Sequence, residues 1–174
     1  APEGNAPMGS EVTMSQNPKF IVRAAGSFKQ KDGCPEESID SLSPERLEYL
    51  CAGECYNPSN KRHIIERIEI IKITPQEYAG EAISPLIQDA WKTFSCSGKS
   101  ECVIEFEDEN YLRDSVYYVR AVQELTPAIN GVQSKVTEDS FKLCKGSFRT
   151  DFSDNCLGEI NERAWSSPIY LSKP

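Results

Sequence analysis

Large apolar residues alternate with polar ones in several short segments of the chain. The alternation is clearest over residues 67–73, where Ile68, Ile70 and Ile73 stand among charged side chains and Pro75 follows. A period of two places successive side chains on opposite faces of a strand, so it predicts strands with one face toward a core. The same pattern predicts strands over residues 20–25, 102–107 and 115–124.

A last strand is predicted over residues 163–171, where Pro168 fits an edge strand because proline lacks a backbone donor. With residues 115–124 it gives Tyr-x-Val-Arg-Ala followed by Ser-x-Pro-Ile-x-Leu, which resembles the final hairpin of an immunoglobulin-like or fibronectin type III module. The stretch between them, residues 125–162, is far longer than an ordinary hairpin loop, so we expect an insertion there. We therefore predict a mainly β fold, an antiparallel β-sandwich of the immunoglobulin or fibronectin III type.

One or two short helices are expected among the connections. Ser43 suits an N-cap, Pro44 suits the first helical position, and Leu47 starts an apolar face. Residues 84–91 indicate a short turn or helix that carries a buried tryptophan. The expected core draws on large apolar side chains of the predicted strands: Phe20, Val22, Ile68, Ile70, Ile73, Val103, Phe106, Tyr117, Val119, Val122, Trp165 and Ile169.

The length of 174 residues is enough for one well-buried core. Residues 1–18 contain few large apolar groups, which predicts a linker or an extended arm. Residues 19–174 are predicted to form a single β-sandwich domain. No charged-then-apolar signal segment opens the chain, so we expect that a signal was removed or that the chain is a fragment of a longer protein.

Seven cysteines are many for a chain of this size, and they lie in polar surroundings rich in glycine and proline. This usage favours disulfides in an oxidising compartment. Reduced thiols are one alternative, and zinc bound through Cys51-x-x-x-Cys55 is another. Zinc motifs usually combine two close-spaced pairs, and the second pair is missing here.

The spacing of the cysteines leaves the disulfide connectivity open. Cys96 with Cys102 would close a short loop, and Cys144 with Cys156 would close the next acidic loop. The three remaining cysteines compete for one bond, and the odd number leaves one thiol over: Cys34, Cys51 and Cys55.

The formal net charge is −8, and the pI is near 4.8. A nucleic-acid surface needs clustered lysine and arginine, so we expect no nucleic-acid partner. The densest basic run, residues 61–63, is short and is followed at once by Glu66, as on a solvated face. No run approaches the roughly 20 apolar residues of a membrane helix, so we expect no membrane span.

The common motifs of hydrolases, phosphate-binding loops and dinucleotide sites are missing from the sequence. His63 is the only histidine, so any Ser-His-Asp or Cys-His scheme must run through it. It lies in a charged segment, where an exposed or capping histidine is common. We therefore predict no catalytic residue, no cofactor-binding residue and no cofactor.

Acidic residues offer oxygen ligands of the kind that Ca²⁺ takes. The two acidic runs are residues 105–109 and 151–154. Neither run reproduces the spaced Asp-x-Asp-x-Asp-Gly loop, and glutamates that alternate along a strand usually form its solvent face. We predict no metal site, with four weak calcium candidates: Asp108, Glu109, Asp151 and Asp154.

Several aromatic residues fall on or near the predicted strands. Such residues more often fill a sandwich core than form a flat platform for a carbohydrate. We favour the core for this set: Trp91, Trp165, Tyr117, Tyr118 and Tyr170.

Residues 67–72, 114–124 and 162–170 also carry a family resemblance. They are similar to the C-terminal part of a bacterial family of large, mostly uncharacterised proteins, whose front portion resembles the PHP-type metal-dependent phosphoesterases. Residues 45–51 and 53–57 fit the same family, and the resemblance covers most of residues 7–172. Its most specific part is the ending Trp-Ser-Ser-Pro, residues 165–168.

The resemblance implies that the metal-binding histidines and aspartates lie upstream, outside this chain. The chain is then a non-catalytic C-terminal accessory domain of a larger protein, partnered by the upstream domain of the same polypeptide. The resemblance and the cysteines together favour a periplasmic, extracellular or cell-surface location. Two alternatives stay open: a module that binds a carbohydrate, a peptide or Ca²⁺, and a small autonomous hydrolase that uses His63 or an acidic pair.

Overall fold

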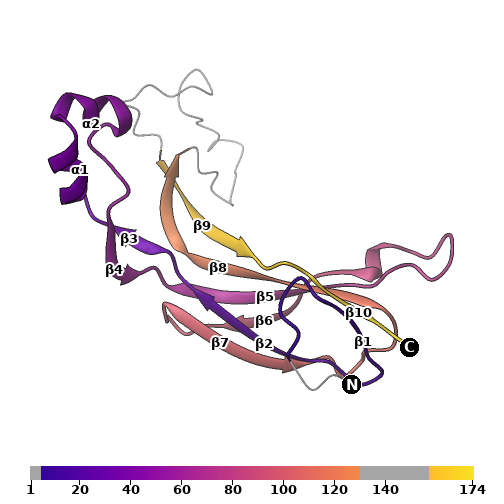
Figure 1. Cartoon of the computed structure of the whole chain (residues 1–174). Coiled ribbons are helices and arrows are strands. Elements are labelled where there is room, and N and C mark those ends of the chain that lie inside the picture. Colours follow the sequence, from indigo (N-terminus) through magenta and orange to yellow (C-terminus); the bar gives the residue numbers. More distant parts are fainter. Residues whose placement is uncertain (1–4, 130–156) are drawn as a thin grey trace, which may run out of the picture.

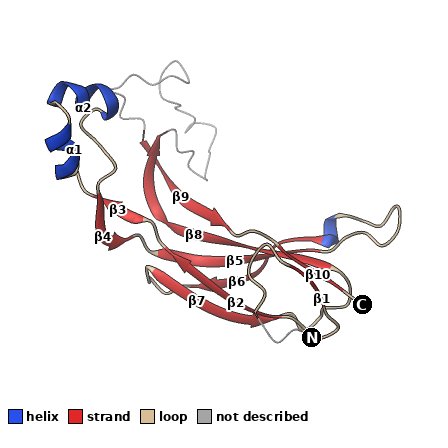
Figure 2. Cartoon of the chain, viewed as in Figure 1, coloured by secondary structure: helices blue, strands red, loops and turns tan. Residues whose placement is uncertain are grey.

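The fold is mainly β with two short α-helices in the part of the chain that the computed structural model describes, residues 5–129 and 157–174 (Figures 1 and 2). Its strands form one large sheet and two pairs. This confirms the predicted fold class at the level of a mainly antiparallel β protein, whereas the immunoglobulin or fibronectin III type stays a prediction. None of the described helices is long and apolar enough to cross a membrane.

The large sheet has the strand order β1–β10–β8–β5–β6, with β9 also paired to β8. All its pairs are antiparallel except that of β1 with β10. Strand β8 is long enough for two partners in succession, because residues 115–117 pair with β10 and residues 120–129 pair with β9. The bounds are β1 (Glu11–Thr13), β5 (Ile65–Ile73), β6 (Ile87–Ser95), β8 (Ser115–Ile129), β9 (Leu157–Trp165) and β10 (Ile169–Ser172).

Strands β2 (Lys19–Ala25) and β7 (Glu101–Glu107) form an antiparallel pair that packs on the large sheet. Figure 2 shows this pair alongside β5 and β6. The core between the two layers has Ile68 and Ile70 of β5 fully buried, with partly buried side chains of β2 and β7 packed against them. Apolar faces meet here because their burial from water stabilises the fold.

Strands β3 (Phe28–Gln30) and β4 (Pro58–Arg62) pair with each other and lead to the helices α1 (Glu36–Ser41) and α2 (Pro44–Cys51). Figure 1 places both helices at the end of the molecule away from the two termini. The predicted helix is confirmed as α2, because the Ser43 side chain accepts a hydrogen bond from the Arg46 amide and Pro44 follows at the first position. Helix α1 has no buried residue and no side-chain cap, so it left no pattern in the sequence.

The predicted strands in β2, β5, β7 and the first part of β8 are confirmed. The prediction of a turn or helix over residues 84–91 is wrong for most of that range, because only η1 (Ser84–Leu86) is helical and β6 follows it. The pairing of β5 with β6 shifts register opposite Ile71, and Ala90 has a positive φ of 50°. This irregularity breaks the alternation by which a strand is recognised.

The last predicted strand is divided in two. Residues 163–165 belong to β9 and residues 169–172 to β10. The segment between them, residues 166–168, is not a strand and is held by hydrogen bonds to neighbouring segments. The Ser166 amide donates to the Val119 carbonyl, and the Gly9 amide donates to the Pro168 carbonyl. The expected insertion is shorter than residues 125–162, because β8 and β9 continue pairing to Ile129 and Leu157.

Two residues of the expected core are exposed: Val103, at 58%, and Trp165, at 59%. Val103 lies between Cys102 and Ile104 on β7, and those two neighbours face the large sheet. Since β7 belongs to the outer layer, its other face meets solvent.

The N-terminal segment contributes β1. This strand pairs in parallel with β10, so residues near the two ends of the sequence lie side by side in the large sheet.

Candidate functional site

Three polar side chains meet in the interior, where β5, the end of β7 and β8 come together. The Lys72 ammonium group lies 2.5 Å from Asp108 Oδ2, and the Tyr117 hydroxyl donates to the same oxygen at 2.5 Å. The Asn110 amide donates to Asp108 Oδ1 at 3.0 Å. Asp108 is fully buried, and Lys72 and Tyr117 are nearly so. The carboxylate therefore has a donor at each oxygen.

Burial alone would raise the pKa of Asp108, but the hydrogen bonds from Lys72 and Tyr117 outweigh it and hold that pKa below its usual value. Burial, together with the bond to Asp108, raises the pKa of Tyr117. The Lys72 ammonium also lies 5.1 Å from the ring centre of Trp91. A carboxylate that is fully paired in this way orders the core and offers no free base to a substrate.

His63 lies between β4 and β5 and contacts Glu124 of β8. Its Nδ1 is 2.9 Å from Glu124 Oε1, which also accepts from the Ile64 amide at 3.2 Å and lies 3.0 Å from Lys29 Nζ. These contacts, led by that with Lys29, lower the pKa of Glu124 to about 2. The backbone of His63 also contacts Gly26, where an added Cβ would lie 1.8 Å from the His63 carbonyl oxygen.

A histidine oriented by a carboxylate supplies two of the three members of a catalytic triad, and the third member is a nucleophile. Among the described residues, no serine, threonine or cysteine side chain hydrogen-bonds to the His63 ring. The nearby Ser27 hydroxyl donates to Gln123 Oε1 at 2.9 Å. The contacts at His63 therefore tie β3 and β8 to the segment that leads into β5.

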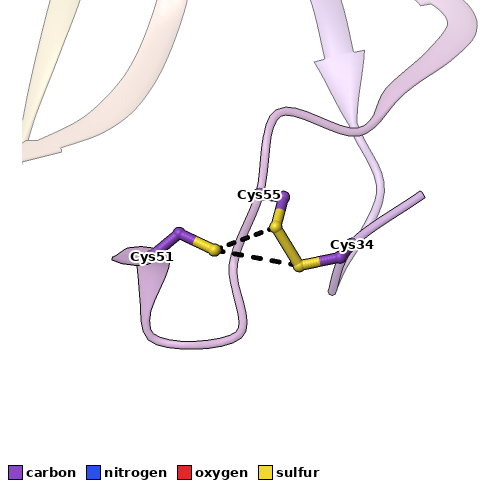
Figure 3. Close-up of side chains that lie close together, drawn as sticks. All are labelled: Cys34, Cys51 and Cys55. Atoms are coloured by element: carbon purple, nitrogen blue, oxygen red, sulfur yellow. Dashed lines mark hydrogen bonds between the residues drawn. A yellow bond between two sulfur atoms is a disulfide. The ribbon is translucent and has the colours of Figure 1, made fainter. Parts of the chain in front are cut away.

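Three cysteines gather at the end of α2 (Figure 3). Cys34 precedes α1 and is bonded to Cys55, which follows α2. Cys51, the last residue of α2, is a free thiol whose sulfur lies 2.9 Å from that of Cys55 and 3.9 Å from that of Cys34. The three sulfurs are close enough to hold one metal ion, but a metal binds thiolates, so this disulfide and a metal exclude each other.

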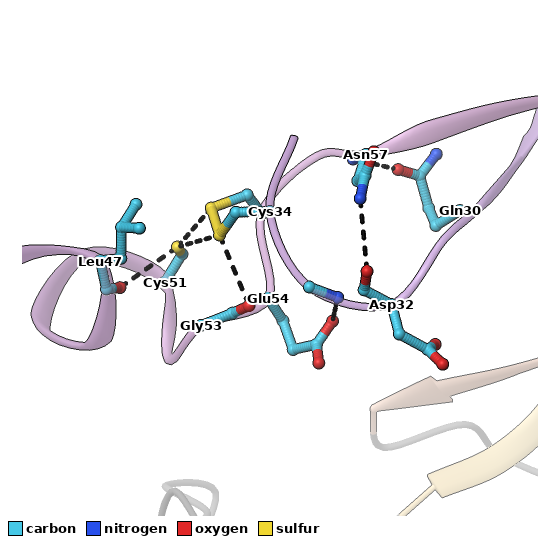
Figure 4. The surroundings of a disulfide bond; sticks show 10 residues. Gln30, Asp32, Cys34, Leu47, Cys51, Gly53, Glu54 and Asn57 are labelled. Carbon is cyan, nitrogen blue, oxygen red and sulfur yellow. Dashed lines mark hydrogen bonds between the residues drawn. A yellow bond between two sulfur atoms is a disulfide. The ribbon is translucent and has the colours of Figure 1, made fainter. Parts of the chain in front are cut away.

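Hydrogen bonds hold the segments on both sides of the disulfide together (Figure 4). The Gly33 amide donates to Glu54 Oε2 at 3.0 Å, and the Asn57 side chain donates to the Asp32 carbonyl at 3.3 Å. The Cys51 thiol donates to the Leu47 carbonyl at 3.3 Å. The cysteines are thus kept together by the surrounding backbone as well as by the covalent bond.

An apolar groove with a volume of 460 Å³ runs between β2 and the part of the large sheet formed by β8, β9 and β10. Among the described residues, the outer layer here consists of β2 and β7, and these two strands do not extend over this part of the large sheet. Ile21 and Trp165 line the groove and are 60% and 59% exposed, and Ala6, Pro7 and Met8 lie along it too. Exposed apolar surface of this kind marks contacts with other molecules or domains.

The structure describes two of the four weak calcium candidates. Asp108 is buried in the cluster with Lys72, whereas Glu109 is exposed in the following turn. Asp151 and Asp154 lie outside the described residues. Among the described residues, Asp108 and Glu109 do not belong to a group of three possible metal ligands.

Of the cysteines, Cys96 is joined to Cys102, and both are buried in the core. The proposed pair Cys144 and Cys156 lies outside the described residues. Among the five aromatic residues, Tyr117 is buried, Tyr118 is partly buried and Trp91 packs against the core, whereas Trp165 and Tyr170 are exposed.

No motif marks Lys72 as the partner of Asp108. The available signal is the two-residue period of the strand, which places Lys72 on the same face as the core residues Ile68 and Ile70. Lys72 therefore points inward, where a charge needs a partner. This alternation does not say which acidic residue is the partner. Asp108 is 36 positions away, beyond the end of a strand in the other layer.

Comparisons of this chain with protein-family models, with curated proteins and with solved structures found no match.

Proposed function

We propose that the chain is a non-catalytic accessory domain of a larger secreted or periplasmic protein and that it packs against a domain that precedes it in the same polypeptide. The observation that carries this proposal is the apolar groove beside β2. Its exposed Ile21 and Trp165 provide the apolar surface that a contact between domains buries.

The position of the N-terminal segment supports the same contact. Ala6, Pro7 and Met8 line the groove, and the Gly9 amide is fastened to the Pro168 carbonyl. A domain attached ahead of these residues would be tethered beside the groove. A short tether raises the effective concentration of the two surfaces, so a modest contact area is enough to hold them together.

The chemistry of the described polar clusters supports a non-catalytic role. Asp108 and Glu124 have lowered pKa values and are paired with cations, so neither is poised as a general acid near neutral pH. The two disulfides among the described residues support a location in an oxidising compartment.

Oxidative footprinting of the native gene product against the isolated chain tests the proposed contact. We expect the oxidation rate of Trp165 to fall at least fivefold in the longer polypeptide, because the preceding domain covers the groove. Tyr49 of α2, which is 80% exposed and does not line the groove, is the control and keeps its rate. An unchanged rate at Trp165, or an intact mass showing that the native protein begins near Ala1, would refute the proposal.

The edge of β2 favours peptide binding as a second candidate function. Of the described strands only β7 pairs with β2, so the backbone groups on its other edge have no strand partner beside the groove. An extended peptide can add a strand at such an edge and place alternate side chains in an adjacent pocket. Saturable binding of library-selected peptides that perturbs the β2 amides and is lost in Trp165→Ser would support this function, and failure to select any peptide would argue against it.

A further inference from the structure

The sulfur of Cys55 has two cysteine neighbours. It is bonded to Cys34, and the free sulfur of Cys51 lies 2.9 Å away. All three residues are partly exposed, so solvent can take up and supply the protons that sulfur chemistry requires. A thiolate beside a disulfide is the arrangement from which thiol–disulfide exchange proceeds.

We propose that Cys34, Cys51 and Cys55 form a thiol–disulfide exchange site in which Cys55 is shared between two alternative disulfides. The Cys51 thiol loses its proton to solvent, and its thiolate attacks the sulfur of Cys55. The Cys51–Cys55 bond forms as the Cys34–Cys55 bond breaks, and Cys34 leaves as a thiolate that takes a proton from solvent. One disulfide and one thiol are present before and after, so the step needs no oxidant or reductant.

The surroundings suit both forms. In the observed form, the Cys51 thiol donates to the Leu47 carbonyl at 3.3 Å. The sulfur of Cys34 lies 3.4 Å from the Gly53 carbonyl, which is an acceptor for the Cys34 thiol that exchange would release. The free thiol of each form, Cys51 before exchange and Cys34 after it, therefore has a backbone carbonyl acceptor nearby. Exchange leaves neither thiol without a hydrogen-bond acceptor.

Non-covalent contacts keep the three sulfurs together after exchange. The bond from the Gly33 amide to Glu54 and that from the Asn57 side chain to the Asp32 carbonyl join the two segments without help from the disulfide. Released Cys34 therefore remains beside Cys55, and the reaction is reversible.

Exchange changes how the helical end of the molecule is held. The Cys34–Cys55 bond spans 21 positions and connects the segment before α1 to the segment before β4. The Cys51–Cys55 bond would close only the short loop after α2 and would leave the segment before α1 without a covalent tie. It also moves the reactive thiol from α2 to Cys34, so the position at which another thiol or an alkylating reagent reacts depends on which disulfide is formed.

Alkylation mapping of the whole native chain tests the exchange. The folded protein is incubated with excess N-ethylmaleimide and then digested with trypsin, which yields Cys34 in residues 32–46 and both other cysteines in residues 47–61. The observed form gives a cross-linked pair of these peptides labelled at Cys51. The exchanged form gives peptide 32–46 labelled at Cys34 and peptide 47–61 with an internal disulfide.

We expect both sets of peptides, because alkylation traps each molecule in the form whose free thiol reacts, at Cys51 before exchange or at Cys34 after it. Cys96 and Cys102, which are disulfide-bonded and buried, measure the background in the same sample. A Cys34 label no greater than this background overturns the proposal.

Two variants separate exchange from simple opening of the disulfide. In Cys51→Ser the thiol beside the Cys34–Cys55 disulfide is removed, so the Cys34 label should fall to background, and a persistent label would overturn the proposal. In Cys34→Ser treated with oxidised glutathione as the oxidant, Cys55 should pair with Cys51 as glutathione is reduced, and peptide 47–61 should carry an internal disulfide. Two free thiols in that peptide, in a protein whose circular dichroism matches the parent, would also overturn it.

Discussion

Lys72 and Asp108 form a buried ion pair that joins the large sheet to the end of the second layer, with the ammonium nitrogen 2.5 Å from the carboxylate oxygen. Removing two charges from water is costly, and their attraction offsets that cost only when the remaining polar atoms also have partners. Tyr117 and the Asn110 amide supply those partners on the carboxylate. We therefore expect the fold to lose less stability when both charges are removed than when only one of them is removed.

Replacing only Lys72 by methionine should destabilise the protein by about 3–5 kcal/mol, because it leaves a buried carboxylate without its cation. The double variant Lys72→Met/Asp108→Leu should be less destabilised than the sum of its two single variants, since neither charge then remains. Urea unfolding of the four proteins measures this coupling.

The exposed pair Lys19 and Glu107 is the matched control for that cycle. It also joins a lysine to an acid near the end of β7, but Lys19 is 79% exposed and the nitrogen lies 3.6 Å from the oxygen. Lys19→Met should change the free energy of unfolding by less than about 1 kcal/mol. Equal effects at Lys19 and Lys72 would mean that burial does not set the strength of the Lys72 pair.

Glu124 should contribute to loss of stability in acid. Its pKa is lowered from 4.5 to about 2 in the folded protein, chiefly by Lys29. A carboxyl group whose pKa is lower when folded stabilises the fold above its unfolded pKa, and this stabilisation disappears as the pH falls from about 4.5 to about 2.

The variant Glu124→Gln should therefore be less stable than the parent at pH 7 and should lose less stability in acid. The urea unfolding midpoints of the two proteins should become similar near pH 2. Parallel curves of midpoint against pH would show that the contacts of Glu124 do not stabilise the fold.

Gly26 should tolerate no side chain. An added Cβ would lie 1.8 Å from the His63 carbonyl oxygen and 2.7 Å from its carbon, and neither backbone atom can turn aside. Gly26→Ala should cost about 3 kcal/mol or more of the free energy of unfolding, at the upper end for overpacked sites. Thermal unfolding followed by circular dichroism measures it.

Gly33→Ala is the control for the loss of a glycine alone. Gly33 has a φ of +77° but nothing within 4 Å of an added Cβ, so only backbone strain of about 1–2 kcal/mol applies. A cost at Gly26 no larger than that at Gly33 would contradict the close approach to His63.

The Cys96–Cys102 disulfide should stabilise the edge of the core. It connects the end of β6 to β7, and so the large sheet to the second layer, with both cysteines buried. The variant Cys96→Ala/Cys102→Ala should lose about 2–4 kcal/mol of the free energy of unfolding. Chemical denaturation checks this, and a loss below about 1 kcal/mol would show that the surrounding packing holds the two layers together without the bond.

Local signals account for the elements that could be predicted. Alternation identified β2, β5 and β7, and Ser43 with Pro44 marked the start of α2. Strand β6 carries a register shift beside Ala90, and α1 buries nothing, so neither leaves a regular pattern. The exposure of Val103 follows from alternation once it is known that β7 lies in an outer layer.

The candidate sites were less predictable than the strands. The cysteine count implied a leftover thiol, but its placement 2.9 Å from Cys55 depends on how α2 and the loop after it fold back toward Cys34. The paired state of Asp108 depends on contact with Lys72 and Tyr117, which come from other strands.

The sequence by itself determined that the protein is mainly β, which segments form the regular strands and where α2 begins. These properties depend on alternation and capping within a few neighbouring residues, which the order of amino acids states directly. Only the tertiary structure decided which acid pairs with Lys72, which of Cys34, Cys51 and Cys55 stays free and that a groove lies open beside β2. Each of these depends on distances between segments far apart in the chain, and such distances are set by the packing of the two layers rather than by any local pattern.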